Sequence, residues 1–111
     1  MSAVAHSIEP VTDATWTEEV LMSDVPVLVD FWADWCAPCK RVRPVLESLA
    51  EEWAGRVRVV SLDIDVNPNA TRDYGILGAP TLMLFRDGEP VRTVVGAQPK
   101  SRLVAQLEPA L

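Results

Sequence analysis

The sequence predicts an α/β layer fold, in which helices cover a mixed β-sheet. Two apolar runs typical of buried strands, 25–32 and 57–64, are each followed by a stretch with helical character. That alternation is the pattern of parallel strands joined by crossover helices. Near the C-terminus, two more apolar runs flank Asp87-Gly88, which indicates a β-hairpin and therefore an antiparallel edge.

The N-terminal elements follow from capping and periodicity. Thr15-x-x-Glu18 is a capping-box pattern, and it predicts a first helix over 13–22. The apolar residues of this helix recur at helical spacing: Trp16, Val20 and Leu21. The run 25–32 is rich in valine and predicts a central strand that is buried on both faces.

A second helix is predicted directly after this strand. Its apolar residues recur at steps of three and four: Val42, Val45, Leu46, Leu49 and Trp53. Gly55 stands where a helix ends, and Pro44 inside the helix is expected to kink it. The second buried strand, 57–64, comes next.

The remaining elements are a short helix over 67–74 that ends at Gly75, the hairpin, and a last helix over 98–111. The last helix is expected to turn its leucines inward: Leu103, Leu107 and Leu111.

Length and charge limit the classes of function. A chain of 111 residues fits one domain, 1–111, with about 1–10 as an N-terminal extension that could be mobile. Ten basic and 16 acidic residues give a net charge of -6, which argues against a nucleic-acid or anionic-membrane surface. We find neither a secretory signal nor a membrane span, and we expect a cytoplasmic monomer without nucleic-acid or membrane partners.

The segment Cys36-Ala37-Pro38-Cys39 falls at a strand-to-helix junction. Pro38 suits the first helical turn, so Cys36 is placed at the helix N-terminus, where negative charge on its sulfur is stabilised. Lys40 and Arg41 would add to that effect. Because side chains at i and i+3 are neighbours on a helix, the pair can interconvert between dithiol and disulfide with little backbone motion.

Three alternative roles for the two cysteines remain open. A structural disulfide would close so short a loop that it would stabilise little. Two cysteines and the distant His6 cannot complete a zinc site in one chain, although two chains could share one. In the third alternative the two cysteines are unrelated to one another. We expect neither a metal nor a bound cofactor, because thiol–disulfide exchange needs none.

Asp30 lies inside the buried run 25–32. A buried carboxylate without an obvious cation should have a raised pKa, which suits a general base. Our hypothesis is that Asp30 relays the proton of Cys39 through a water molecule. The alternative is an edge aspartate that caps a turn.

The segments "VLVDFWADWCAPCK" and "YGILGAPTLMLFRDGEPV" resemble the thioredoxin family, and the resemblance runs from about Thr12 to Leu111. It implies a thioredoxin-like three-layer α/β/α sandwich, with a mixed sheet of four to five strands and about four helices. It implies that Cys36 is the exposed attacking thiolate, Cys39 the resolving thiol, and Asp30 the buried carboxylate beneath Cys39.

The resemblance also implies roles for neighbouring residues. Pro80, for which sequence alone leaves cis and trans open, would be a cis-proline facing the cysteines. Four residues would bind substrate: Trp32, Ala79, Pro80 and Gly96. Four would tune the active site: Trp35, Ala37, Pro38 and Lys40.

Three positions depart from the family pattern. Ala37-Pro38 replaces the commonest Gly-Pro dipeptide, which could displace the redox potential. Ser61 stands where many members carry a lysine near the buried aspartate, so Asp30 would lose that charge partner. Ala79 replaces a branched aliphatic residue, which could widen substrate tolerance.

The function expected from these residues is a protein-disulfide reductase acting through Cys36 and Cys39. Its partners would be disulfide-containing proteins and, as the resemblance implies, a thioredoxin reductase that recharges it. Two alternatives remain at this point. One is a non-catalytic subunit or chaperone-like binding module that uses the same surface, and the other is a net disulfide oxidase or isomerase.

Overall fold

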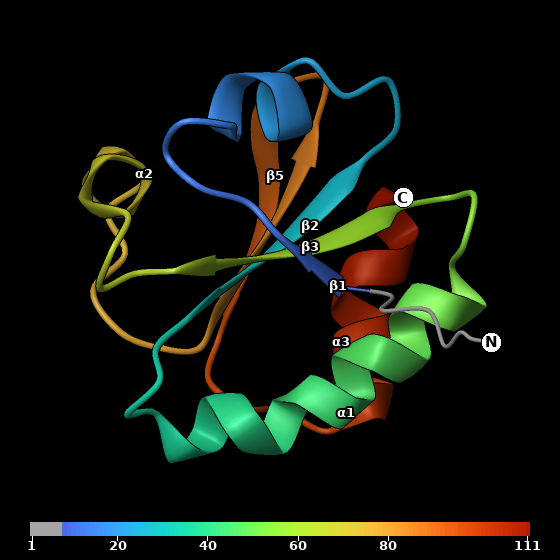
Figure 1. Cartoon of the computed structure of the whole chain (residues 1–111). Helices are drawn as coiled ribbons and strands as arrows, with labels where there is room; N and C mark the ends of the chain where they lie inside the picture. The colour runs from blue at the N-terminus through green and yellow to red at the C-terminus, as the bar shows by residue number, and fades with distance from the viewer. Residues whose placement is uncertain (1–7) are drawn as a thin grey trace, which may run out of the picture.

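The computed structural model describes residues 8–111 and shows a mixed β-sheet between two layers of helices (Figure 1). Within these residues the sheet has five strands in the order β1-β3-β2-β4-β5. Their bounds are β1 Ile8–Pro10, β2 Val27–Trp32, β3 Arg58–Asp63, β4 Thr81–Arg86 and β5 Glu89–Val95. β1, β3 and β2 run parallel, and β4 and β5 add two antiparallel pairings to the sheet. The parallel pair β2–β3 and the antiparallel hairpin are as the sequence predicts, whereas β1 is not predicted.

The helices divide between the two faces of the sheet. α1 (Ala37–Glu52) and α3 (Lys100–Leu107) cover one face, and the π-helix η1 (Thr17–Leu21) and α2 (Pro68–Asp73) cover the other. A short 3₁₀ helix, η2 (Glu108–Ala110), follows α3. The predicted three-layer α/β/α sandwich is confirmed.

Strand β2 has apolar side chains on both faces, so helices must cover the sheet on both sides. Its side chains alternate between the faces, so Leu28 packs against α1 and α3, whereas Val29 and Phe31 pack on the side of η1. Asp30 has the parity of Leu28 and therefore faces α1 from the centre of the sheet. The burial predicted for this strand is confirmed, and it extends to the carboxylate itself.

The β4–β5 hairpin turns at the predicted dipeptide. Asp87 and Gly88 both have positive φ, 53° and 79°, which is the requirement of a tight two-residue turn. A Cβ at Gly88 would lie 3.0 Å from the carbonyl oxygen of Leu21, so this glycine also allows the turn to approach η1.

The structure corrects the first predicted helix. The helical segment over 17–21 is a π-helix, and the predicted capping box is wrong, because Trp16 is the N-cap residue and makes no side-chain cap. The Thr15 hydroxyl instead accepts a hydrogen bond from the Thr12 N–H in the preceding turn, at 2.9 Å. The Thr15 hydroxyl, which the capping-box pattern assigned to the helix, therefore stabilises the preceding turn.

Two termini also differ from the prediction. Residues 8–10 form β1 along the edge of β3, so they are not an extension; 1–7, including His6, lie outside the described residues. The last helix begins at Lys100 rather than residue 98 and changes to 3₁₀ geometry at Glu108. Leu103 and Leu107 are fully buried as predicted. No helix within residues 8–111 combines the length and apolarity that crossing a bilayer requires.

Candidate active site

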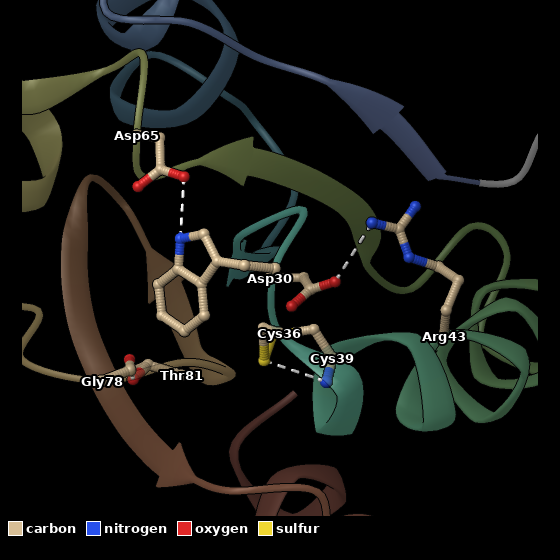
Figure 2. The surroundings of a disulfide bond; sticks show 8 residues. Asp30, Cys36, Cys39, Arg43, Asp65, Gly78 and Thr81 are labelled. Atoms are coloured by element: carbon tan, nitrogen blue, oxygen red, sulfur yellow. Dashed lines mark hydrogen bonds and ion pairs between the residues drawn. A yellow bond between two sulfur atoms is a disulfide. The ribbon is translucent and has the colours of Figure 1, made fainter.

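Cys36 and Cys39 form a disulfide where the chain passes from the sheet into α1 (Figure 2). Cys36 is the N-cap residue of α1 and Cys39 lies in its first turn, so the helix geometry sets their Cα atoms 5.3 Å apart. That separation is within the usual range for a disulfide. Pro38 occupies the first helical turn, as the sequence predicts.

The two sulfurs have different environments. The Cys36 sulfur accepts a hydrogen bond from the backbone N–H of Cys39 at 3.1 Å, in the position that a capping oxygen normally takes. In the dithiol form this N–H and the helix dipole stabilise negative charge on Cys36. Cys39, by contrast, is a buried residue of the first turn of α1.

The expectation that Cys36 is exposed is wrong for the disulfide form described here. Cys36 is 2% exposed and Cys39 is 3% exposed. Both pack with Ala33, and the partly buried residues around them are Trp32, Ile64 and Ala79. In the disulfide form Cys36 is therefore part of a buried apolar cluster.

Asp30 lies at the centre of the sheet, between Ser61 of β3 and Leu82 of β4, and is fully buried. Neither carboxylate oxygen has a hydrogen-bond partner among the described residues. Burial raises the pKa of Asp30 from 3.8 to about 6, and the positive charge of Arg43 opposes that rise. The alternative of an aspartate capping a turn at an edge is therefore excluded.

Arg43 corrects the expectation that Asp30 has no cation. Its Nη2 lies 3.5 Å from Oδ2 of Asp30, and Figure 2 shows the two groups pointing toward one another. The guanidinium also lies over the Trp32 ring, 5.5 Å from the ring centroid. The positive charge that a lysine at position 61 on β3 would bring near Asp30 is supplied instead by Arg43 on α1.

A cleft of about 420 Å³ opens beside these groups. Its lining residues come from β1, β2, β3 and α1: Ile8, Pro10, Trp32, Cys39, Lys40, Arg43 and Ser61. Cys39 and the cation that pairs with Asp30 therefore share one solvent-facing hollow. This cleft gives water a route to the neighbourhood of Cys39.

Three of the predicted substrate-binding residues come together on the other side of the disulfide. The Ala79–Pro80 peptide bond is cis, as the resemblance implies. The Gly96 N–H donates a hydrogen bond of 2.8 Å to the Pro80 carbonyl, and Ala79 packs against the cysteine cluster. Trp32, the fourth, is half-buried in the cleft with Arg43.

The predicted tuning residues surround the start of α1. Ala37 and Lys40 are exposed and Pro38 is half-buried. Trp35 is 67% exposed, and its indole N–H donates a hydrogen bond of 2.9 Å to the Asp65 carboxylate. Asp65 thus fixes the orientation of a large aromatic side chain that faces solvent.

Sequence reasoning did not identify three residues of this site: Arg43, Ile64 and Asp65. Arg43 had a detectable signal, because it is four residues after Cys39 and so lies on the same face of α1. Ile64 and Asp65 reach the site only through the position of the β3–α2 loop, and no local pattern marks them.

Comparison with known proteins agrees with this geometry. The family model described as "Thioredoxin" matches residues 7–109. The chain is 51% identical over 108 residues to "Thioredoxin 1" of a Nostoc species, covering 97% of each chain. It is 50% identical over 101 residues to "Thioredoxin" of Porphyra purpurea, covering 91% of this chain and 94% of that one.

A third relative gives the same result: the chain is 52% identical over 97 residues to "Thioredoxin" of Mycobacterium tuberculosis, covering 87% of this chain and 84% of the relative. The matched region holds the whole sheet and the cysteine pair that begins α1. The chain therefore belongs to the thioredoxin family, as a disulfide reductase whose active-site pair is Cys36 and Cys39.

Proposed function

We propose that Cys36 is the attacking sulfur of this reductase and Cys39 the resolving sulfur. The Cys36 thiolate attacks one sulfur of a target disulfide, forms a mixed disulfide, and releases the other target sulfur as a thiolate that takes a proton. The Cys39 thiolate then attacks the Cys36 sulfur, and the second target thiolate leaves and is protonated. The target gains two electrons and two protons, and the chain ends as the Cys36–Cys39 disulfide.

We assign the proton of Cys39 to Asp30. A thiol among apolar neighbours resists ionisation, so its attack on the mixed disulfide needs a base. The observation that carries this assignment is the buried carboxylate on the α1 side of the sheet, with no hydrogen-bond partner among the described residues. A pKa raised to about 6 brings that carboxylate near neutral pH, where a general base is most effective.

Substrate binding is assigned to the surface around the cysteines. Ala79, Pro80 and Gly96 would accept an extended segment of the target, and Trp32 and Trp35 would contact its apolar side chains. The hydrogen bond from Gly96 to Pro80 and the exposure of Trp35 support this assignment.

We also propose the partners, the oligomeric state and the compartment of this protein. Members of the family work on disulfide substrates and are recharged by a reductase; for this chain we infer a flavin- and nicotinamide-dependent thioredoxin reductase. We further propose that residues 1–111 form one domain that acts as a monomer in the cytoplasm. The net charge of -6 supports protein partners over nucleic acid.

Stopped-flow reaction of the reduced protein with excess Ellman's reagent tests the assignment, because the first thionitrobenzoate release reports attack and the second reports resolution. Asp30→Asn is expected to slow the second release by roughly 100-fold near neutral pH, the usual size of a general-base effect. Cys39→Ser, which allows only the first release, is the control for attack. An unchanged second release from about pH 6 to 9 would exclude Asp30 as the base.

A further inference from the structure

We propose that Arg43 is the positioning residue of the proton relay: it holds the Asp30 carboxylate in place on the α1 side of the sheet and sets the pH range in which the relay works. This inference rests on the proposed role of Asp30 as the base. Arg43 approaches Asp30 from α1, whereas the register partner of Asp30 on β3, Ser61, offers only a hydroxyl group.

The contacts of Asp30 leave Arg43 as its one charged neighbour within ion-pair distance in the described part of the chain. Oδ2 lies 3.5 Å from the guanidinium, and neither carboxylate oxygen accepts a hydrogen bond. The strands on either side contribute Ser61 and Leu82, which carry no charge. From α1, the other ionisable groups on this side are Lys40 on the cleft and the two cysteines.

Besides its ion pair with Asp30, the Arg43 guanidinium is positioned by α1 and by the ring of Trp32. Arg43 lies one helical turn after Cys39, at i+4, so both side chains lie on the same face of α1. Its charged group lies over the ring of Trp32, which has the parity of Asp30 on the same strand. A side chain fixed by the helix and by the Trp32 indole gives the carboxylate a charge at a fixed position.

Arginine suits this role because it keeps its charge at every pH at which proteins are stable. Its side chain is 29% exposed and lines the cleft with Cys39, so the pair is in contact with solvent through Arg43 rather than through Asp30. Without that charge, burial alone would keep Asp30 protonated to higher pH, and a protonated acid cannot accept the proton of Cys39.

The first measurement is the titration of the Asp30 carboxyl carbon by NMR in the disulfide form, which does not depend on activity. Arg43→Gln is expected to raise the midpoint by about one pH unit, the lower end of what a nearby opposite charge contributes. Arg41→Gln is the matched control, since Arg41 is an exposed neighbour and its loss changes net charge equally. A midpoint that moves no further in Arg43→Gln than in Arg41→Gln would overturn the proposal.

The second measurement is the pH profile of the second thionitrobenzoate release. The limb that Asp30 controls should move to higher pH in Arg43→Gln, by the same amount as the NMR midpoint. Adding Ser61→Lys to Arg43→Gln should move both values back, because residue 61 is the register partner of Asp30 on β3. Arg43→Lys, which keeps the charge, provides a folded variant if the glutamine variant is unstable, and its shift should be smaller.

The outcomes separate this inference from the proposed function. If Asp30→Asn leaves resolution unchanged, the relay itself is wrong, whatever Arg43 does to the titration. If Asp30→Asn slows resolution but the Arg43 variants shift neither the titration nor the profile, the relay stands and the role of Arg43 is wrong.

Discussion

The backbone N–H of Cys39 donates a hydrogen bond of 3.1 Å to the sulfur of Cys36, its disulfide partner. The sulfur thus caps α1 in place of an oxygen side chain. When the disulfide is reduced, the same N–H and the helix N-terminus stabilise a thiolate on Cys36, whereas Cys39 lies within the first turn, on the cleft that it shares with Arg43.

This difference predicts unequal alkylation of the reduced protein. At neutral pH, iodoacetamide should modify Cys36 at least about 10-fold faster than Cys39, because the thiolate is the reactive form. Peptide mapping by mass spectrometry at a series of times measures both rates in one sample, and Cys36→Ser reports the rate of Cys39 alone. Equal rates, or a faster Cys39, would contradict the assignment of attacking and resolving sulfurs.

The buried carboxylate predicts a specific dependence of stability on pH. Because burial raises the pKa of Asp30 from 3.8 to about 6, the folded protein holds this proton more tightly than the unfolded chain does. The stabilisation from that proton is complete below about pH 4 and is lost as pH rises through about 6. A difference of about two pKa units corresponds to roughly 3 kcal/mol.

Urea unfolding of the oxidised protein, compared with Asp30→Asn at each pH, measures this contribution. The other carboxyl groups are common to both proteins, so their titration cancels in the difference. The free energy of unfolding of Asp30→Asn relative to the wild type should rise by roughly 3 kcal/mol between about pH 4 and pH 7. A difference that stays constant with pH would show that Asp30 is not perturbed.

Trp35 and Trp16 predict opposite effects of the same substitution. Trp35→Phe removes a 67% exposed ring and its bond to Asp65, so it should cost less than about 1 kcal/mol of stability while lowering kcat/KM for protein disulfides. Trp16 is 7% exposed and packs edge-on against Phe85, so Trp16→Phe should cost about 1–3 kcal/mol and leave kcat/KM of the folded protein unchanged.

Thermal unfolding and a reductase assay on a protein substrate measure both quantities for each variant. If Trp35→Phe left kcat/KM unchanged, the exposed indole would have no part in substrate binding. If folded Trp16→Phe also lost activity, a change in core packing would be enough to lower kcat/KM, and the effect of Trp35→Phe could not be assigned to substrate binding.

Much of the fold could be predicted because its signals are local. Strand β2 is a run of apolar residues, the hairpin turns at Asp87-Gly88, and the spacing of Cys36 and Cys39 places them in one helical turn. The burial of Asp30 followed from its position inside that run. Each of these inferences needed only neighbouring residues.

What could not be predicted depends on contacts between distant segments. Strand β1 has three residues, of which only Ile8 is buried, and it forms because β3 presents an open parallel edge. The pairing of Arg43 with Asp30 joins a helix to a strand, so no pattern within either element indicates it. The π-helical geometry of η1 follows Trp16, whose ring packs against Phe31 of β2, and no sequence pattern indicated it.

Gly96 gives a test of the proposed substrate surface. Its φ is +92°, a conformation that disfavours any other residue, yet a Cβ built there meets nothing within 4 Å. Gly55, at the end of α1, has a φ of +87° and an equally open Cβ position. The two glycines are thus alike in strain and space, and they differ in that Gly96 bonds to the Pro80 carbonyl.

Both Gly96→Ala and Gly55→Ala should therefore cost about 1 kcal/mol of stability, from the backbone conformation alone. Only Gly96→Ala should raise KM for a protein disulfide, because its added methyl group would occupy space that the extended target segment needs beside Pro80. The effect on Ellman's reagent, which is too small to extend along this surface, should be weaker. Equal KM values for the two variants, with equal stabilities, would show that substrate does not pass over Gly96.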